Sequence, residues 1–333
     1  MNQIKKILMP TDFSKTAQNA MKYAIELAWT HKAKLTLMHV VPYIPNLGHD
    51  IAGYYLLAQK EDLKRAQIKM KELQDEILSK FLLKVKTIVK NDYVQGAIVD
   101  YAKSSNTDLI IMGTHGVTGI KEFFIGSNSY GVVNQSHCPV ITIHPKGGKK
   151  NDAPAILIKA SNARKDKGHP ADRKTSLKLL NETRNQTFKT IVLPVRIAKH
   201  SREKVLYIVQ IAKKYDSFVH IAAYVSRIDN TGELRKVNAY AKQVEKYLKS
   251  NNIKCRITII CGANYIQQIL KFAEKRKADL ITIMAQRDYG LSQYISGPYA
   301  QQLVNHSKIP VLSVPVKYNP KLIKYYNPVT ASY

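Results

Sequence analysis

Two segments of equal length decide how this sequence folds. The first, DLIIMGTHGVTGIKEFFIGSNSYGVVNQSHCPVITI, runs from Asp108 to Ile143. The second, DLITIMAQRDYGLSQYISGPYAQQLVNHSKIPVLSV, runs from Asp279 to Val314. They align without a gap, and each is bounded by apolar, β-branched residues, but most inner glycines of the first are missing from the second. A repeat of this length indicates the duplication of a whole domain.

The residues before the first segment alternate between strand and helix patterns. Short apolar runs at 5–10 and 33–42 flank a stretch with helical spacing, for which Ser14 is the expected N-cap. A strand–helix–strand unit implies a parallel sheet. We expect an irregular connection at 43–58, an amphipathic helix at 61–82, and further strands at 84–90, 108–112 and 139–143. The pattern therefore predicts an α/β domain with an open, Rossmann-like, five-stranded parallel sheet.

The same plan returns in the second half of the chain. KTIVLP matches KKILMP, and helix and strand patterns follow in the same order, with a helix expected at 201–216 and another at 238–252. The stretch between the halves is rich in lysine, glycine and proline, as linkers are, although a short strand and a helix are expected within it. The expected divisions are a first domain at 1–144, a basic linker at 145–188, a second domain at 189–316 and a Tyr/Pro/Lys tail at 317–333.

Composition narrows the class of protein. The chain has 333 residues, 45% of them hydrophobic, without an apolar run long enough for a membrane helix. Three cysteines form no CxxC pair, which favours a reducing compartment, and we expect the cytoplasm. The net charge of +28 comes mainly from the linker and the second half. Because no nucleic-acid-binding motif accompanies this charge, a solvated surface is the favoured interpretation.

The first segment contains the candidate ligand-binding residues. A buried strand leads into Gly113 and Gly116, and Gly126-Ser127 begins the next helix. Glycines after a strand let the backbone approach an anion, and the free N–H groups of a helix N-terminus favour phosphate. Plain turn chemistry is the alternative for these glycines. The spacing matches neither a Walker A loop nor the GxGxxG dinucleotide fingerprint.

The pattern G-x2-G-x9-G-[S/T] resembles the ATP-binding signature of the universal stress protein family. MPTDFSKTAQNAMKYAIELA and LMHVV are similar to that family's first strand, first helix and second strand. The resemblance covers 1–144 and 189–316, so the chain looks like a tandem member of the family. It implies two domains of the adenine nucleotide alpha hydrolase-like fold and a bound ATP, for which Mg²⁺ is the expected counter-ion.

The resemblance also implies which residues surround the nucleotide. Asp12 would lie by the adenine, the backbone of Val41 would meet the base, and Met112 would lie near the ribose. Turn or cap chemistry for Asp12 and a core position for Val41 and Met112 are the alternatives. No arranged nucleophile and base are evident, so at most weak ATP hydrolysis is expected and a binding or regulatory role is favoured. The expected ATP-binding set is Pro10, Thr11, Asp12, Val41, Met112, Gly113, Gly116, Gly126, Ser127, Asn128 and Ser129.

The second domain departs from this pattern. Arg196, Met284, Arg287 and Pro298 stand in place of Asp12, Gly113, Gly116 and Ser127. We expect this domain not to bind ATP but to serve in packing or partner recognition. Its strand 310–314 and the strand 139–143 are natural pairing edges, which predicts an internal pseudo-dimer. A homodimer, an unnamed protein partner and a module that binds no nucleotide stay open, and nucleic-acid binding is disfavoured.

Overall fold

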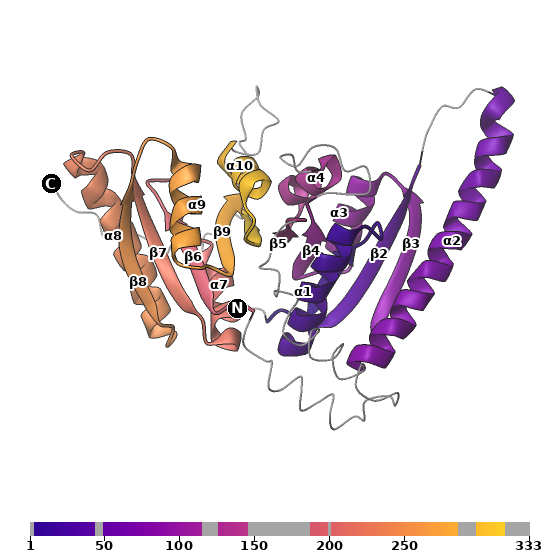
Figure 1. Ribbon diagram of the computed structural model, residues 1–333, viewed down its shortest axis with the longest axis horizontal. Coiled ribbons are helices and arrows are strands. Elements are labelled where there is room, and N and C mark those ends of the chain that lie inside the picture. The colour runs from indigo at the N-terminus through magenta and orange to yellow at the C-terminus, as the bar shows by residue number, and fades with distance from the viewer. Residues whose placement is uncertain are drawn as a thin grey trace.

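The computed structural model describes residues 3–43, 49–114, 126–145, 187–198, 201–285 and 298–316, without the side chains of 49–55 and 298. Its strands form one ten-stranded sheet in the order β3-β2-β1-β4-β5-β10-β9-β6-β7-β8 (Figure 1). The first five are β1 (Lys6–Pro10), β2 (Lys34–Pro42), β3 (Val85–Asp92), β4 (Leu109–Gly113) and β5 (Val140–Ile143). The other five are β6 (Thr190–Val195), β7 (Phe218–Val225), β8 (Cys255–Cys261), β9 (Leu280–Ala285) and β10 (Val311–Pro315).

Each half of the sheet is parallel and has the expected five strands. In the first half, β1 lies between β2 and β4, so the direction of the strand connections reverses there. In the second half, β6 lies in the same way between β7 and β9. Ligands of open α/β sheets bind at the carboxyl ends of strands beside such a reversal. The fold thus offers one such position in each domain.

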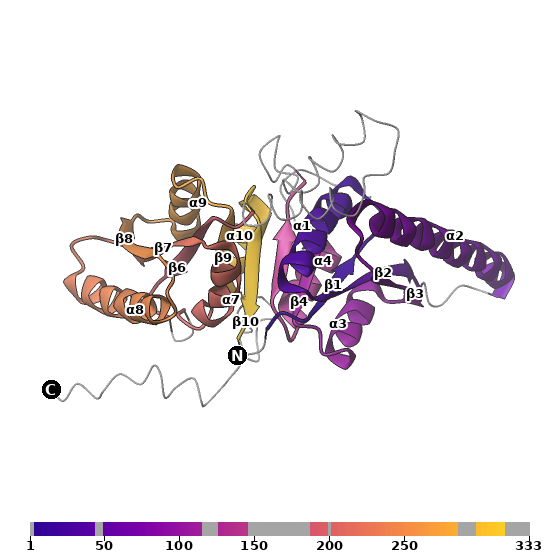
Figure 2. The same ribbon diagram turned by 90° about the horizontal axis from the view of Figure 1, so that it is seen from below.

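The two halves join through an antiparallel pair of strands. Ile141 of β5 is opposite Leu312 of β10, and the carbonyl of Val311 accepts a hydrogen bond from the Thr142 hydroxyl. Figure 2 shows this seam from below, with β10 in yellow near the centre of the molecule. The structure therefore uses the two apolar fifth strands for pairing within one chain, as the sequence predicts.

Helices cover both faces of the sheet. One hydrophobic cluster extends through both halves and takes in α1 (Lys15–His31), α2 (His49–Phe81), α7 (Val205–Tyr215) and α8 (Thr231–Ser250). On the other face the core is divided. One cluster there includes residues of α3 (Val94–Ser104) and α4 (Ser127–Gln135), and another includes residues of α9 (Tyr265–Lys275) and α10 (Pro298–His306). No helix among the described residues is long and apolar enough to cross a membrane.

The expected irregular connection at 43–58 is wrong for much of its length. Helix α2 begins at His49, and Figure 1 shows it along the outer edge of the sheet, beside β3. Leu56 and Leu57 are 55% and 64% exposed, so burial does not hold this end of the helix. Strong helix formers from Leu56 to Gln59 instead continue the helical pattern of the following residues.

Two helices of the second half differ from expectation at their starts. Helix α7 begins at Val205, because 201–204 form turns before it. Helix α8 begins at Thr231, well before residue 238, because the Asn230 side chain accepts a hydrogen bond from the Glu233 N–H at 3.0 Å and caps it. The strand and helix expected in the linker, and the tail, lie outside the described residues.

Candidate functional site

The turn after β1 is held by its own side chains. Pro10 is buried at the end of the strand, and the Thr11 N–H donates to the Met38 carbonyl at 2.8 Å. Asp12 Oδ1 accepts from the Ser14 N–H at 3.0 Å, and Ser14 Oγ accepts from an N–H of the first turn of α1 at 3.1 Å. The Ser14 cap is confirmed. Asp12 has the turn role that was its structural alternative, with its carboxylate half-buried at the carboxyl end of β1.

The end of β4 and the start of α4 are joined by hydrogen bonds. The Gly126 N–H donates to the Thr114 carbonyl at 2.7 Å, and the Thr114 N–H donates to the Ile143 carbonyl at 2.9 Å. The buried Ser129 hydroxyl donates to the Gly113 carbonyl at 2.8 Å. The structure thus brings Gly113, Gly126 and Ser129 together. It also commits the Ser129 hydroxyl to a hydrogen bond within the fold, whereas the family resemblance placed Ser129 among the ATP-binding residues.

Helix α4 begins after a glycine at its N-cap position. Gly126 occupies the N-cap position, so the N-cap residue itself has no side chain to accept a hydrogen bond from the first turn. Ser127 and Asn128 are exposed. The first N–H groups of a helix have no intrahelical acceptor, and the helix dipole makes this end positive. The first turn of such a helix is able to bind an anion.

Close packing against α1 explains why a glycine stands at position 113. A Cβ at this position would lie 2.6 Å from Thr16 Cγ2 and 3.1 Å from the Thr16 backbone carbon. The strand end approaches α1 so closely that only glycine fits without a shift. Gly116, the other glycine of the motif at this strand end, lies outside the described residues.

Val41 and Met112 are core residues in the structure. Their exposed fractions are 6% and 5%, and Met112 belongs to the core beneath α3 and α4. The Val41 carbonyl accepts a hydrogen bond from the Asn91 side chain at 3.1 Å. A base that meets the backbone of Val41 would therefore share that carbonyl with Asn91.

A pocket beside Val41 was not anticipated from the sequence. It measures about 330 Å³ and lies between the ends of β1 and β2 and the helix α2. Its polar and charged lining comes from His39, Asp62, Arg65 and Lys69, and its apolar lining comes from Phe13, Val41, Pro42 and Ala66. Only Val41 of this lining was among the expected site residues.

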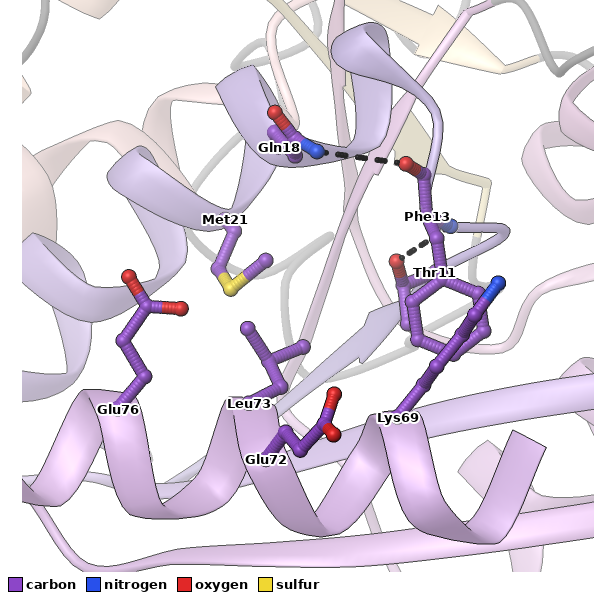
Figure 3. A pocket seen from close by; sticks show the side chains of 8 residues that line it. All are labelled: Thr11, Phe13, Gln18, Met21, Lys69, Glu72, Leu73 and Glu76. Atoms are coloured by element: carbon purple, nitrogen blue, oxygen red, sulfur yellow. Dashed lines mark hydrogen bonds between the residues drawn. The ribbon is translucent and has the colours of Figure 1, made fainter. Parts of the chain in front are cut away.

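A second, smaller pocket continues on the other side of Phe13. It measures about 180 Å³, and Figure 3 shows Phe13 and Lys69 at one end of it, with Glu72 and Glu76 of α2 below. Lys69 Nζ lies 5.5 Å from the centroid of the Phe13 ring. The left-handed backbone of Phe13, with φ of 64°, places its ring between the two pockets. Nothing in the local sequence pattern signals that conformation.

His39 contributes an oriented imidazole to the larger pocket. Its Nδ1 lies 2.7 Å from the Thr11 carbonyl, and its ring centroid lies 4.6 Å from that of Phe13. Since a carbonyl only accepts, Nδ1 carries the proton in this contact and Nε2 of the neutral ring is an acceptor. Such a group suits the amino or hydroxyl donors of a ligand. Among the described residues no cluster of three His, Cys, Asp or Glu side chains could hold a metal ion.

The comparisons with known proteins agree with this architecture. The model of the universal stress protein family matches residues 3–144 and again residues 187–315. The chain belongs to the universal stress protein family. Two of its relatives are from Methanocaldococcus jannaschii. Universal stress protein MJ0531 is 32% identical over 145 residues, covering 43% of this chain and 83% of its own. Universal stress protein MJ0577 is 30% identical over 156 residues, covering 43% of this chain and 96% of its own.

A solved structure extends the fold match to both domains. The crystal structure of a universal stress protein from Archaeoglobus fulgidus superimposes with a TM-score of 0.64. The alignment covers 94% of this chain and 99% of that one at 17% identity. This likeness shows that the tandem arrangement of two such domains recurs, and it says nothing of a shared ligand.

Proposed function

We propose that this universal stress protein binds ATP in its N-terminal domain, at the carboxyl ends of β1 and β4. The observation that carries the proposal is the N-terminus of α4, which has a glycine at its N-cap position and which Gly126 and Ser129 hold against the end of β4. The first-turn N–H groups of a helix that begins at a strand-order reversal are a general solution for phosphate binding. The signature glycines and the family resemblance add to this support.

Different predicted residues contact different parts of the nucleotide. The phosphates take the N–H groups of Ser127, Asn128 and Ser129, with Gly113 and Gly116 supplying bare backbone at the strand end. Asp12 and the backbone of Val41 contact the adenosine, over the buried Pro10, Thr11 and Met112. The pocket between β2 and α2 then offers His39 as an acceptor and Phe13 as an aromatic surface. Mg²⁺ accompanies the phosphates rather than occupying a protein-built metal site.

The second domain has a different role in this proposal. Its helix α10 begins with Pro298, which supplies no N–H at the position equivalent to Ser127. The second domain packs against the first through β10, and its outer surface is left for a protein partner in a stress response. We place the protein in the cytoplasm, which suits the exposed, free thiol of Cys261. The domain limits proposed from the sequence, 1–144 and 189–316, are kept.

The test is calorimetric titration of the full chain with ATP and Mg²⁺. The substitution Ser127→Pro copies the second domain, and it keeps the helix because proline is well tolerated at the first helical position. It removes one phosphate-binding N–H, so we expect the affinity for ATP to fall about tenfold or more. Ser79→Ala, on the exposed end of α2, is the matched control and should bind as the wild type does.

The alternative is an interaction module that binds no nucleotide. In that case the glycines of the first domain serve turns and packing, as Gly113 does against Thr16. Absence of heat and of any thermal shift at millimolar ATP and Mg²⁺ would reject the ATP proposal and leave this alternative. Equal affinity of the wild type and Ser127→Pro would reject the proposed position of the phosphates.

A further inference from the structure

At the carboxyl end of β6, the Arg196 guanidinium lies over two tyrosine rings that contact each other. The Arg196 guanidinium carbon lies 4.5 Å from the ring centroid of Tyr299 and 5.5 Å from that of Tyr265. The two rings meet edge to face at 5.3 Å, and Tyr224 packs on Tyr265 at 4.9 Å. This arrangement lies at the strand-order reversal of the second domain, where a ligand is expected in such a sheet.

A second cation lies beside the first and is buried. Lys204 is 2% exposed, and its ammonium donates to the Ser201 carbonyl at 2.5 Å. The Ser201 hydroxyl accepts from the Arg196 N–H at 3.0 Å, so one serine connects the two basic residues. Within the described part of the chain, neither Arg196 nor Lys204 has a carboxylate at ion-pair distance.

The electrostatics of this pair are unfavourable as they stand. Burial, with a smaller contribution from the Arg196 charge, lowers the pKa of Lys204 to about 7. The tyrosine faces attract the guanidinium charge but accept few of its five N–H donors. Tyr265 is the first residue of α9, and Tyr299 is the first residue of α10 whose side chain is described. The positive N-terminal ends of both helices therefore lie close to Arg196. Among the described residues, the groups gathered here therefore carry an excess of positive charge.

We propose that Arg196 and Lys204 bind a small phosphate-bearing anion in the second domain. The site is separate from the ATP site proposed for the first domain and uses different chemistry. There the donors are backbone N–H groups, whereas here they are a guanidinium fork and an ammonium held by Ser201. The tyrosines keep the fork in place, so that little side-chain freedom is lost on binding.

A phosphate group fits these donors for two reasons. Its oxygens match the spacing of a guanidinium fork, which binds phosphate in a bidentate way. Its double negative charge also compensates both cations at once, which a carboxylate does only in part. The replacement of Asp12 by Arg196 then exchanges an acidic residue for the anion's main ligand, instead of merely abolishing a site.

The first experiment measures binding of inorganic phosphate and of glycerol phosphate to the full chain by calorimetry. We expect Arg196→Gln and Lys204→Met each to weaken binding by about tenfold or more. Arg227→Gln is the matched control, because Arg227 is exposed and already pairs with Asp229. Tighter binding of glycerol phosphate identifies a phosphate monoester as the ligand, and tighter binding of inorganic phosphate identifies the free ion.

The second measurement separates this site from the first domain. At about pH 8 the buried lysine is largely neutral, so binding of a dianion should take up close to one proton per chain. Titrations in two buffers of different ionisation enthalpy report that uptake. We expect Lys204→Met to abolish it, whereas a phosphate bound only at α4 would leave it unchanged.

Three outcomes would overturn the proposal. They are the absence of binding at millimolar phosphate, equal binding by wild type and both variants, and proton uptake that persists in Lys204→Met. Loss of folding is not expected for Lys204→Met, because an apolar chain of similar length replaces a buried charge. Tyr299→Leu, at a 38% exposed position, gives a further variant that should weaken phosphate binding without disturbing the core.

Discussion

At the scale of single residues, one glutamate is buried where the two halves of the chain meet. Glu26 of α1 is 1% exposed. Its Oε2 accepts a hydrogen bond from the Thr187 hydroxyl, which comes from the other half of the chain, and its buried Oε1 has no hydrogen-bond partner among the described residues. Burial raises the pKa of Glu26 to about 8, and the Thr187 hydrogen bond opposes the shift. The carboxyl group is therefore mostly protonated at neutral pH.

This environment predicts a pH-dependent stability. The folded pKa lies above the unfolded value of 4.5, so the folded state binds the proton more tightly between pH 4.5 and about 8. The contribution to stability is complete below pH 4.5 and is lost as the pH rises through 8. A shift of this size corresponds to ~5 kcal/mol at most. Glu26→Gln should keep the hydrogen bond and remove this part of the pH dependence.

Urea unfolding at several pH values measures the effect as a difference between wild type and variant. That difference matters because burial also lowers the pKa of the neighbouring His31 to about 4, which acts in the opposite direction. Glu61→Gln, at an exposed position of α2, is the control. Parallel pH profiles for the wild type and Glu26→Gln would show that Glu26 is ionised in the folded protein.

At the scale of single residues, the sequence predicts contacts between neighbours in the chain and misses contacts between distant residues. The Ser14 cap depends on an acceptor three residues from its donor, so the pattern alone reveals it. Glu26 stands in an amphipathic stretch, where a charged residue normally faces solvent. Its burial depends on Thr187, which is 161 residues away in the chain. No local pattern contains that contact.

At the scale of secondary-structure elements, the close contact between β4 and α1 can be tested by its effect on stability. A Cβ on Gly113 would lie 2.6 Å from Thr16 Cγ2. We therefore expect Gly113→Ala to lower the free energy of unfolding by about 1–3 kcal/mol, as overpacking does. Adding Thr16→Ser removes the clashing methyl group and should recover part of that loss. A double-mutant cycle by urea unfolding measures the recovery.

Gly96 provides the matched control for this pair. It lies in α3, and a Cβ there would meet no atom within 4 Å. Gly96→Ala should leave stability unchanged or raise it by about 0.5–1 kcal/mol, because alanine favours the helix. Equal losses for the two substitutions would mean that Gly113 is needed for a reason other than its contact with Thr16.

The second domain shows how the same strand end tolerates a large residue. Met284 replaces Gly113, and here the first helix begins at Val205, farther beyond Pro194 than Lys15 lies beyond Pro10. The turns at 201–204 replace the first part of the helix. The sequence pattern predicted both helices, but not this shift, because helical spacing does not report where the first turn meets its neighbours. The strands were better predicted, since their apolar runs are short and bounded.

For the whole molecule, the main feature is that two domains share one sheet and one core. The β5–β10 pair makes the sheet continuous, and the cluster beneath α1, α2, α7 and α8 includes residues of both halves. The sequence predicted the pairing from two apolar strands. The antiparallel register and the buried polar contacts beside it depend on how the domains dock, which repeats in the sequence do not encode.

A continuous core predicts that the two domains unfold as one unit, and the seam is where that coupling can be weakened. Leu312 is buried opposite Ile141 across the seam, whereas Leu280 is equally buried opposite Ile191 within the second domain. Leu312→Ala and Leu280→Ala should each cost about 2–5 kcal/mol. Scanning calorimetry should resolve two transitions for Leu312→Ala, because the domains lose their coupling, but one for the wild type and Leu280→Ala. If Leu312→Ala still unfolds in one transition, the shared core beneath the helices, rather than the strand pair, holds the domains together.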